Sequence, residues 1–461
     1  MSKVKVDLKE ELLKKLREFK PDIVGVSALF SEIAVGLQIS EYVKKWDPHT
    51  MVIWGNKIAT MSPEKILSNK SVDFVYRGEG IEGVEEFFGR IKRGEDHYSS
   101  PNISYVNRSG DIVNNKLLPY FQDLDSLPYL DWSIFDRRQF IRNYDGLTYI
   151  AGDHMLTWGC PNRCTYCINH AYRDLYKINC DKPGRFIRSY SVDRAIDELE
   201  FLKNKWELSF YKFQDEDFCL KPISYLEEFS DKYKKRVGLP FAVMANAHNS
   251  TKEKLSIMKD MGCVSVSIGI ESGNKGIRRE VLKRTETMED IKRAVKDMND
   301  LGIRTSSFNM LGLPFDNRDT IMETININRE SGVACPNSGF FYPLEKTELR
   351  DISIDNKFFD PVSDEMLDTN NPCLHLPDLS TEELICLRDR FVLYVKMPDE
   401  YIPFIKRSEV DDGIGRKLFL KLGDIYEKCS LTSVYGGGWC DAGNKEKYMK
   451  ELEAIERGDY E

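Results

Sequence analysis

Residues 158–170 read WGCPNRCTYCINH and contain the most informative pattern in the chain. Its three cysteines, Cys160, Cys164 and Cys167, directly follow an apolar run at 148–157 that is typical of a buried strand. Three thiolates this close in sequence can converge on one inorganic centre, and soft sulfur ligands favour iron–sulfur clusters or zinc. With three ligands instead of four, a cubane cluster keeps one iron open, as a catalytic metal requires.

Other uses of these cysteines remain open at this stage. A structural zinc site would take His170 as its fourth ligand, although the spacing to His170 is shorter than in zinc fingers. An ordinary four-cysteine cluster would take Cys180. Packing of the three cysteines in an apolar core is disfavoured because polar residues, among them Asn162, Arg163 and Asn169, surround them.

Downstream of residue 147, strand patterns alternate with helical patterns. Candidate strands cover 148–157, 208–214, 240–246, 264–270, 303–311 and 337–342, and amphipathic helices separate them. Six βα units predict a partial (β/α)6 barrel of the TIM type, in which active groups lie on the loops that follow the strands.

Upstream of the cysteines the same alternation occurs on a smaller scale. Apolar runs at 21–29, 51–55 and 72–80 predict a parallel, doubly wound sheet of the Rossmann-like type. Residues 98–146 lack sustained periodicity and contain a hairpin around Asn107–Asp111. We therefore predict an α/β protein with a Rossmann-like domain at 1–110, a linker at 111–146, a partial barrel at 147–345 and a mainly helical C-terminal region at 346–461.

Composition narrows the class of protein. The net charge of −9 disfavours nucleic acid as a partner, because phosphate contacts need clustered cations. Neither a secretory signal nor a membrane-spanning run is visible, so we expect a cytoplasmic location and read the eleven cysteines as thiols or metal ligands instead of disulfides. The downstream cysteines match no compact motif for a second cluster: Cys335, Cys373, Cys386, Cys429 and Cys440.

The segment CPNRCTYC at 160–167, placed after a first barrel strand, resembles the signature of the radical S-adenosylmethionine (SAM) superfamily. The resemblance implies that Cys160, Cys164 and Cys167 bind a 4Fe–4S cluster, and that the amino and carboxylate groups of SAM chelate its fourth iron. It implies further that one electron cleaves SAM to methionine and a 5′-deoxyadenosyl radical. A reductant such as flavodoxin or ferredoxin would supply that electron.

Later strand ends match the family in the expected order. Asp215 and Glu216 resemble the acidic stretch that contacts the methionine amino group of SAM, although a solvated acidic loop is the alternative. Asn246 is a candidate polar contact at the next strand end. Glu271 and Ser272 resemble the family's ribose-binding pair.

The remaining cofactor contacts follow from the same resemblance. Lys283 or Arg284 would meet the carboxylate of SAM, unless both are ordinary surface cations. Leu311 and Gly312, in NMLGLP, resemble the Gly-Leu-Pro turn that supports adenine. Tyr166 matches the aromatic position before the last cysteine, whose backbone lies near adenine in the family.

The N-terminal region resembles the cobalamin-binding (B12-binding) domain of one radical SAM subgroup. The connector at 123–136 and the helical tail at 376–398 resemble the same subgroup. Relative to that domain, the region is incomplete at its N-terminus and lacks the Asp-x-His-x-x-G motif. The turn at 54–57 reads WGNK, without the usual histidine, so cobalamin either binds without a protein imidazole or the domain only supports the barrel.

Together these features predict a cobalamin-dependent methyltransferase acting on an unactivated carbon of a small molecule, such as a natural-product precursor, a lipid or a glycan. The alternative is a cobalamin-independent radical SAM enzyme that performs a rearrangement or carbon–carbon bond formation, with a vestigial N-terminal domain. A methylthiotransferase is disfavoured, since no cysteine for a second cluster precedes Cys160. A non-catalytic cluster-bearing protein would form no 5′-deoxyadenosine. The sequence pattern identifies neither the substrate nor the oligomeric state.

Overall fold

The computed structural model describes residues 7–144, 146–361, 371–434 and 442–459. The chain forms two compact units. The first, which we call the N-terminal unit, contains residues 1–126, 159–188 and 343–369, and the second, which we call the barrel unit, contains residues 127–158, 189–342 and 370–461. The chain therefore enters each unit three times.

The N-terminal unit is built on a five-stranded sheet with the order β1-β2-β3-β4-β5. Strands β1 (Ile23–Ser27), β2 (Met51–Gly55) and β3 (Phe74–Tyr76) are parallel, whereas the hairpin of β4 (Ile103–Val106) and β5 (Ile112–Asn114) is antiparallel. The helices of this unit are α1 (Leu8–Phe19), α2 (Ile33–Trp46), α3 (Asn56–Met61), α4 (Pro63–Leu67), α5 (Glu82–Arg93), α6 (Ile168–Asn179) and α12 (Glu348–Asp355).

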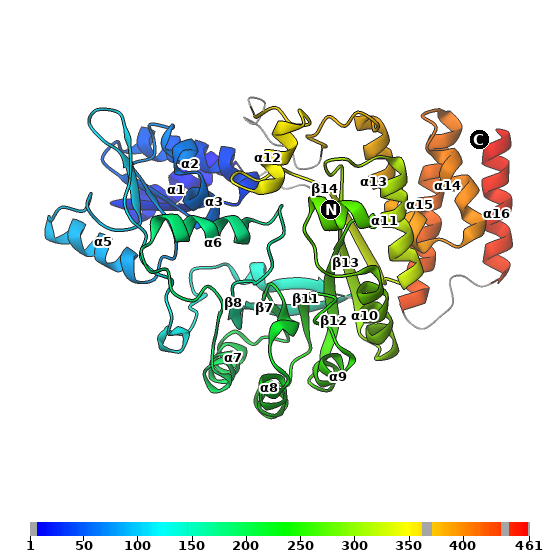
Figure 1. The fold of residues 1–461 in the computed structure, drawn as a ribbon, viewed down its shortest axis with the longest axis horizontal. Helices are drawn as coiled ribbons and strands as arrows, with labels where there is room; N and C mark the ends of the chain where they lie inside the picture. The colour runs from blue at the N-terminus through cyan, green and yellow to red at the C-terminus, as the bar shows by residue number, and fades with distance from the viewer. Residues whose placement is uncertain (1–6, 145, 362–370, 435–441, 460–461) are drawn as a thin grey trace. The chain divides into compact units, whose positions relative to one another are not determined.

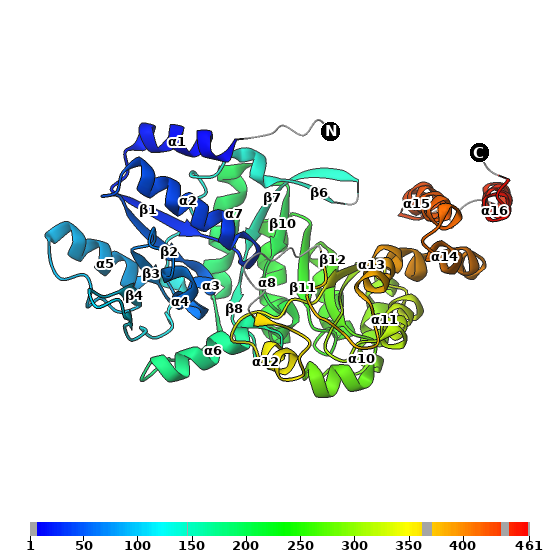
Figure 2. The same ribbon diagram turned by 90° about the horizontal axis from the view of Figure 1, so that it is seen from above.

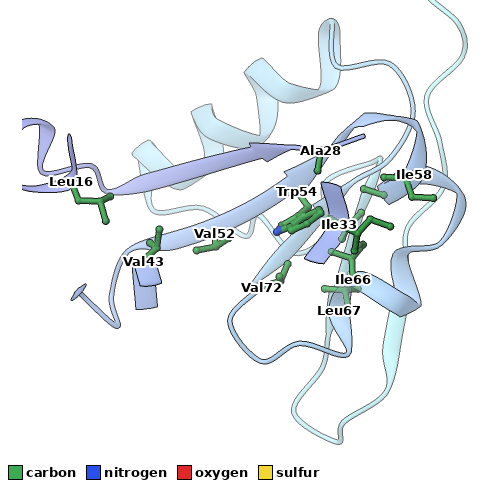
Figure 3. Packing of buried hydrophobic residues seen from close by; sticks show 12 residues of the cluster. Leu16, Ala28, Ile33, Val43, Val52, Trp54, Ile58, Ile66, Leu67 and Val72 are labelled. Carbon is green, nitrogen blue, oxygen red and sulfur yellow. The ribbon is translucent and has the colours of Figure 1, made fainter. Parts of the chain in front are cut away.

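Trp54 organises the core of the N-terminal unit. Figure 3 shows its indole ring near the centre of a cluster of buried aliphatic side chains. The indole Nε1 donates a hydrogen bond to Ser40 Oγ at 2.9 Å, which satisfies the one polar atom of a fully buried ring. A Cβ atom at Gly36 would lie 2.5 Å from this ring, so α2 packs on β2 at a distance that only glycine allows.

The barrel unit is built on a seven-stranded sheet with the order β14-β13-β12-β11-β10-β7-β6. Six strands are parallel: β7 (Leu147–His154), β10 (Phe210–Phe213), β11 (Phe241–Ala245), β12 (Cys263–Glu271), β13 (Arg304–Leu311) and β14 (Cys335–Phe340). At one edge β6 (Ile141–Tyr144) pairs antiparallel to β7. Since β14 and β6 are edge strands, the sheet is an open half-barrel.

Helices cover the outer face of this sheet, as Figure 1 shows. They are α7 (Val192–Trp206), α8 (Ile223–Arg236), α9 (Lys252–Asp260), α10 (Met288–Asp300) and α11 (Arg318–Ser331). The chain ends in α13 (Thr381–Lys396), α14 (Ile402–Ser408), α15 (Gly413–Val434) and α16 (Ala442–Arg457), and α15 and α16 lie side by side in Figure 2.

The predicted fold class is confirmed: the N-terminal α/β sheet, the partial barrel of six βα units and the helical tail are all present. The sequence did not predict β6, α6 or α12, and the expectation that no cysteine forms a disulfide is wrong for Cys429, which is disulfide-bonded. The domain boundaries at 110, 146 and 345 stay predictions. None of the helices in the described ranges combines the length and the hydropathy of a membrane-spanning segment.

Candidate cofactor site

The three cysteines lie on the loop that connects β8 (Thr157–Trp158) to α6. None of the three forms a disulfide, and each is half-buried. Cys167 occupies the N-cap position of α6, and its backbone N–H donates to the carbonyl of Cys164 at 3.0 Å. A thiolate at the start of a helix is stabilised by the helix dipole, so this position favours the metal-binding form of the side chain.

Gly159 fixes the entry to this loop. Its φ of +92° is a left-handed conformation that favours glycine. A Cβ atom here would lie 2.4 Å from the carbonyl oxygen of Phe186, so backbone approaches backbone with no room for a side chain. The loop is therefore held against the segment that contains Phe186.

The donor set suits an iron–sulfur cubane. In such a cluster each thiolate binds a different iron, so the three sulfur atoms need not converge as the ligands of one ion do. Within the described ranges, no three Cys, His, Asp or Glu side chains are grouped closely enough to hold a single metal ion. His170, the alternative fourth ligand, has its Nε2 atom 2.9 Å from Asp174 Oδ2, and burial lowers its pKa.

Two side chains of α6, the helix that follows the cysteine loop, contact segments that follow β2 and β3 within the N-terminal unit. Lys57 Nζ, from the first turn of α3, donates to Asn169 Oδ1 at 2.7 Å. The backbone N–H of Glu79, from the loop after β3, donates to the hydroxyl of Tyr176 at 3.0 Å. The carboxylate of Glu79 also pairs with Arg188, whose side chain is 3% exposed, with the nearest atoms 2.6 Å apart. These contacts hold the loops at the carboxyl ends of two strands next to α6.

The sheet of this unit leaves open space at two glycines. A Cβ atom at Gly25 or at Gly55 would have no neighbour within 4 Å. Asn56 adopts a left-handed φ of +80°, and the turn at 54–57 contains no imidazole. The open surface suits a large flat group such as a corrin, and the residues of this turn offer it no histidine ligand.

In the barrel unit, Asp215 is completely buried at the end of β10. Its oxygens accept hydrogen bonds from the backbone N–H groups of Leu156 at 3.0 Å and Thr157 at 2.9 Å, and it forms an ion pair with Lys221. These donors engage both of its oxygens and fix the chain just before the cysteine loop. The neighbouring Glu216 is half-buried. The assignment of either residue to the amino group of SAM stays a prediction.

Glu286 brings three of the predicted site residues together. It forms an ion pair with Arg284 and accepts a hydrogen bond from Asn246 Nδ2 at 2.5 Å. Arg284 in turn lies 3.5 Å from Glu271, whose φ is +65°. The buried guanidinium of Arg278 donates to the backbone carbonyl of Glu286 at 3.0 Å. Glu286 was not identified from the sequence, although its position two residues after Arg284 was a visible signal.

The remaining residues predicted to contact SAM differ in their exposure and backbone conformation. Ser272 is buried, and its hydroxyl accepts from the backbone N–H of Asn274 at 3.2 Å. Lys283 is exposed and adopts a left-handed φ of +52°. Leu311 is buried, and Gly312 has a φ of +76°. Tyr166 is half-buried and belongs with the cysteines to the N-terminal unit.

A buried acid lies beside the Gly-Leu-Pro turn. Asp316 accepts hydrogen bonds from the backbone N–H of Leu313 at 2.9 Å and from the Thr320 hydroxyl at 2.7 Å. Burial raises its pKa to about 6 against these hydrogen bonds, which lower it. Sequence reasoning did not single out this residue.

Comparisons with known proteins agree with this architecture. The Radical SAM superfamily model matches residues 155–327, and the B12 binding domain model matches residues 2–88. An uncharacterized methyltransferase of Pyrococcus horikoshii is 24% identical over 392 residues, which cover 84% of this chain and 82% of that protein. The anaerobic magnesium-protoporphyrin IX monomethyl ester cyclase of Rubrivivax gelatinosus is 23% identical over 350 residues, which cover 74% of this chain and 60% of that protein.

A solved structure shows the same fold. The cobalamin-dependent SAM radical enzyme OxsB, with aqua-cobalamin and SAM bound, aligns with a TM-score of 0.63 and 15% identity over 98% of this chain and 69% of that one. The chain therefore contains a radical SAM domain with a B12 binding domain ahead of it, and its fold is similar to that of a cobalamin-dependent radical SAM enzyme. It is an enzyme, and its family cofactors are a 4Fe–4S cluster and SAM.

Proposed function

We propose that the chain is a cobalamin-dependent radical SAM methyltransferase that acts on an unactivated carbon of a small molecule. One observation carries the proposal: the cysteine loop and the open B12-type sheet belong to the same compact unit and are joined through α6. A methyl donor on that sheet would thereby keep a fixed position relative to the cluster. The P. horikoshii relative bears the name of a methyltransferase.

The residues of the chain have separable parts in this proposal. Cys160, Cys164 and Cys167 would hold the cluster, while Glu271 and Arg284 would bind the ribose and carboxylate of SAM. When bound, the reduced cluster and SAM supply a 5′-deoxyadenosyl radical that removes a substrate hydrogen atom, and methylcobalamin supplies the methyl group. The protein positions these groups and excludes water from them. A reductant such as flavodoxin or ferredoxin would deliver the electron, and the substrate would be a natural-product precursor, a lipid or a glycan.

The second candidate is a cobalamin-independent radical SAM enzyme that rearranges its substrate or forms a carbon–carbon bond. The cyclase name of the R. gelatinosus relative favours this reading, as does the turn at 54–57 without an imidazole. In that case the N-terminal sheet would support the cysteine loop without binding a corrin.

Anaerobic reconstitution separates the two candidates. The protein is loaded with iron, sulfide and hydroxocobalamin, freed of unbound cofactor, and then given SAM and a reductant. We expect corrin absorbance to stay with the protein and both 5′-deoxyadenosine and S-adenosylhomocysteine to form. The triple variant Cys160→Ala/Cys164→Ala/Cys167→Ala should retain the corrin and lose 5′-deoxyadenosine. Formation of 5′-deoxyadenosine by a protein that retains no corrin would overturn the methyltransferase proposal in favour of the second candidate.

A further inference from the structure

The barrel unit contains a cavity that the proposed cofactor contacts do not fully use. It has a volume of about 660 Å³ and lies between η5 (Ile277–Val281), a π-helical turn, and the start of α10. Five cationic side chains line it: Lys275, Arg278, Arg279, Lys283 and Arg284. With two carboxylates among its lining residues, the cavity carries a net charge of +3 in a chain whose net charge is −9.

The inner cations of the cavity are neutralised by the protein itself. Arg278 is 3% exposed, and its guanidinium lies 3.6 Å from the carboxylate of Glu286. Arg284 forms an ion pair with the same carboxylate and donates to the carbonyl of Gly269 at 2.8 Å. These two arginines therefore build the rigid wall of the cavity, and they hold the β12 strand end in place.

The outer cations are arranged differently. Lys275 and Arg279 are four residues apart in one continuous helical stretch, whereas Lys283 follows the end of that stretch. Lys275 and Arg279 are both exposed, and neither forms an ion pair with any residue that the structure describes. Like charges at this spacing on a helix repel each other weakly, and a bound anion would relieve that repulsion.

The backbone that carries these cations is itself unusual. A π-helical turn is less stable than an α-helical one and commonly occurs at functional sites. Lys283 adopts a left-handed φ of +52°, a conformation that costs free energy in a residue with a side chain.

We propose that this cavity binds a phosphate or phosphonate group carried by the substrate. The proposal names a substrate class and so rests on the proposed function. A single carboxylate, such as that of SAM, needs one cation, whereas the exposed pair Lys275 and Arg279 suits a dianion with several acceptor oxygens. The guanidinium of Arg279 can bind two of those oxygens at once, and Lys275 adds a point charge.

Calorimetric titration with inorganic pyrophosphate tests the proposal on the reconstituted holoenzyme, with saturating SAM present so that the cofactor site is occupied. We compare the wild type with Lys275→Gln/Arg279→Gln and with a control, Lys235→Gln/Lys252→Gln, which removes two exposed lysines elsewhere in the barrel unit. Each lost contact should weaken binding about tenfold, so the double variant should bind about 100-fold more weakly. The control should bind as the wild type does.

A conservative variant and a second readout make the outcome specific. Arg279→Lys keeps the charge but loses the bidentate geometry, so we expect an intermediate affinity. SAM cleavage without substrate should be the same in all of these variants, and it reports on the cofactor site independently of the anion site. Equal affinity of the wild type and the double variant, or no binding by the wild type, would overturn the anion site even if corrin retention and 5′-deoxyadenosine formation are as proposed.

Discussion

Buried carboxylates of the barrel unit hold the strand ends in position. Asp215 fixes the backbone of Leu156 and Thr157, and Asp316 fixes the turn after β13 through Leu313. A buried carboxylate is expensive in free energy unless donors surround it, and both residues have such donors. Substitution of either carboxylate should therefore change the free energy of unfolding more than the catalytic rate.

The variant Asp316→Asn should change how stability depends on pH. The pKa of Asp316 is about 6 in the folded protein and 3.8 ordinarily, so the folded state binds the proton more tightly. The stability from this group is present below pH 4 and is lost as the pH rises through 6. Between pH 5 and pH 7 the wild type should lose about 1 kcal/mol of unfolding free energy relative to Asp316→Asn.

Urea unfolding at both pH values measures this difference. The variant Asp319→Asn removes an exposed carboxylate three residues further along the chain, in the first turn of α11, and is the matched control. A pH-dependent difference of the same size in the control would contradict the assignment to Asp316.

The variant Asp215→Asn should destabilise the fold. It leaves the ammonium of Lys221, 3% exposed, without its counter-charge, and breaking a buried ion pair costs about 3 kcal/mol. The midpoint of urea unfolding measures the loss, and the second substitution Lys221→Met should restore part of it. Unchanged stability together with weaker SAM binding would instead assign Asp215 to the cofactor.

At the scale of elements, the cysteine loop depends on a glycine. Gly159→Ala should reduce the iron content of reconstituted protein several-fold, since the new Cβ would meet the Phe186 carbonyl at 2.4 Å and displace the loop. Gly110 has a similar φ of +89° and open space around it, so Gly110→Ala is the control for backbone strain alone. If both variants bind iron like the wild type, the close approach at Gly159 does not shape the cluster site.

The elements that the sequence predicted are those with apolar periodicity. The six parallel strands of the barrel are apolar runs between amphipathic helices, and such patterns report burial directly. Strand β6 reads IRNY and is mostly exposed, so its pairing with β7 leaves no periodic signal. Helix α6 buries Asn169, Tyr172 and Tyr176, and a buried face of polar and aromatic residues does not look like an apolar stripe.

The candidate site was predicted unevenly for similar reasons. The cysteines are visible because their spacing is itself the signal, whereas Glu286 looks like any acid in a charged loop. Glu286 accepts a hydrogen bond from Asn246, which is 40 residues away in sequence, and it forms ion pairs with Arg284 and Arg278. Contacts between distant segments are set by tertiary packing, which a single sequence does not display.

At the scale of the whole molecule, the cysteine loop belongs to the same compact unit as the N-terminal sheet that matches the B12 binding domain. Lys57, Glu79 and Arg188 carry the bonds that make this assignment. Sequence order alone suggests that the loop belongs to the barrel that it follows. The arrangement makes the N-terminal sheet part of the cluster's own support and gives the proposed corrin a fixed neighbour.

Electron paramagnetic resonance of the reduced, anaerobically reconstituted protein would observe the cluster and its open iron together. We predict a 4Fe–4S signal whose g-values shift when SAM is added, and which is absent from Cys160→Ala/Cys164→Ala/Cys167→Ala. A wild-type protein without such a signal, or with a signal that SAM leaves unchanged, would contradict the claim that three cysteines hold a cluster with one iron free for SAM.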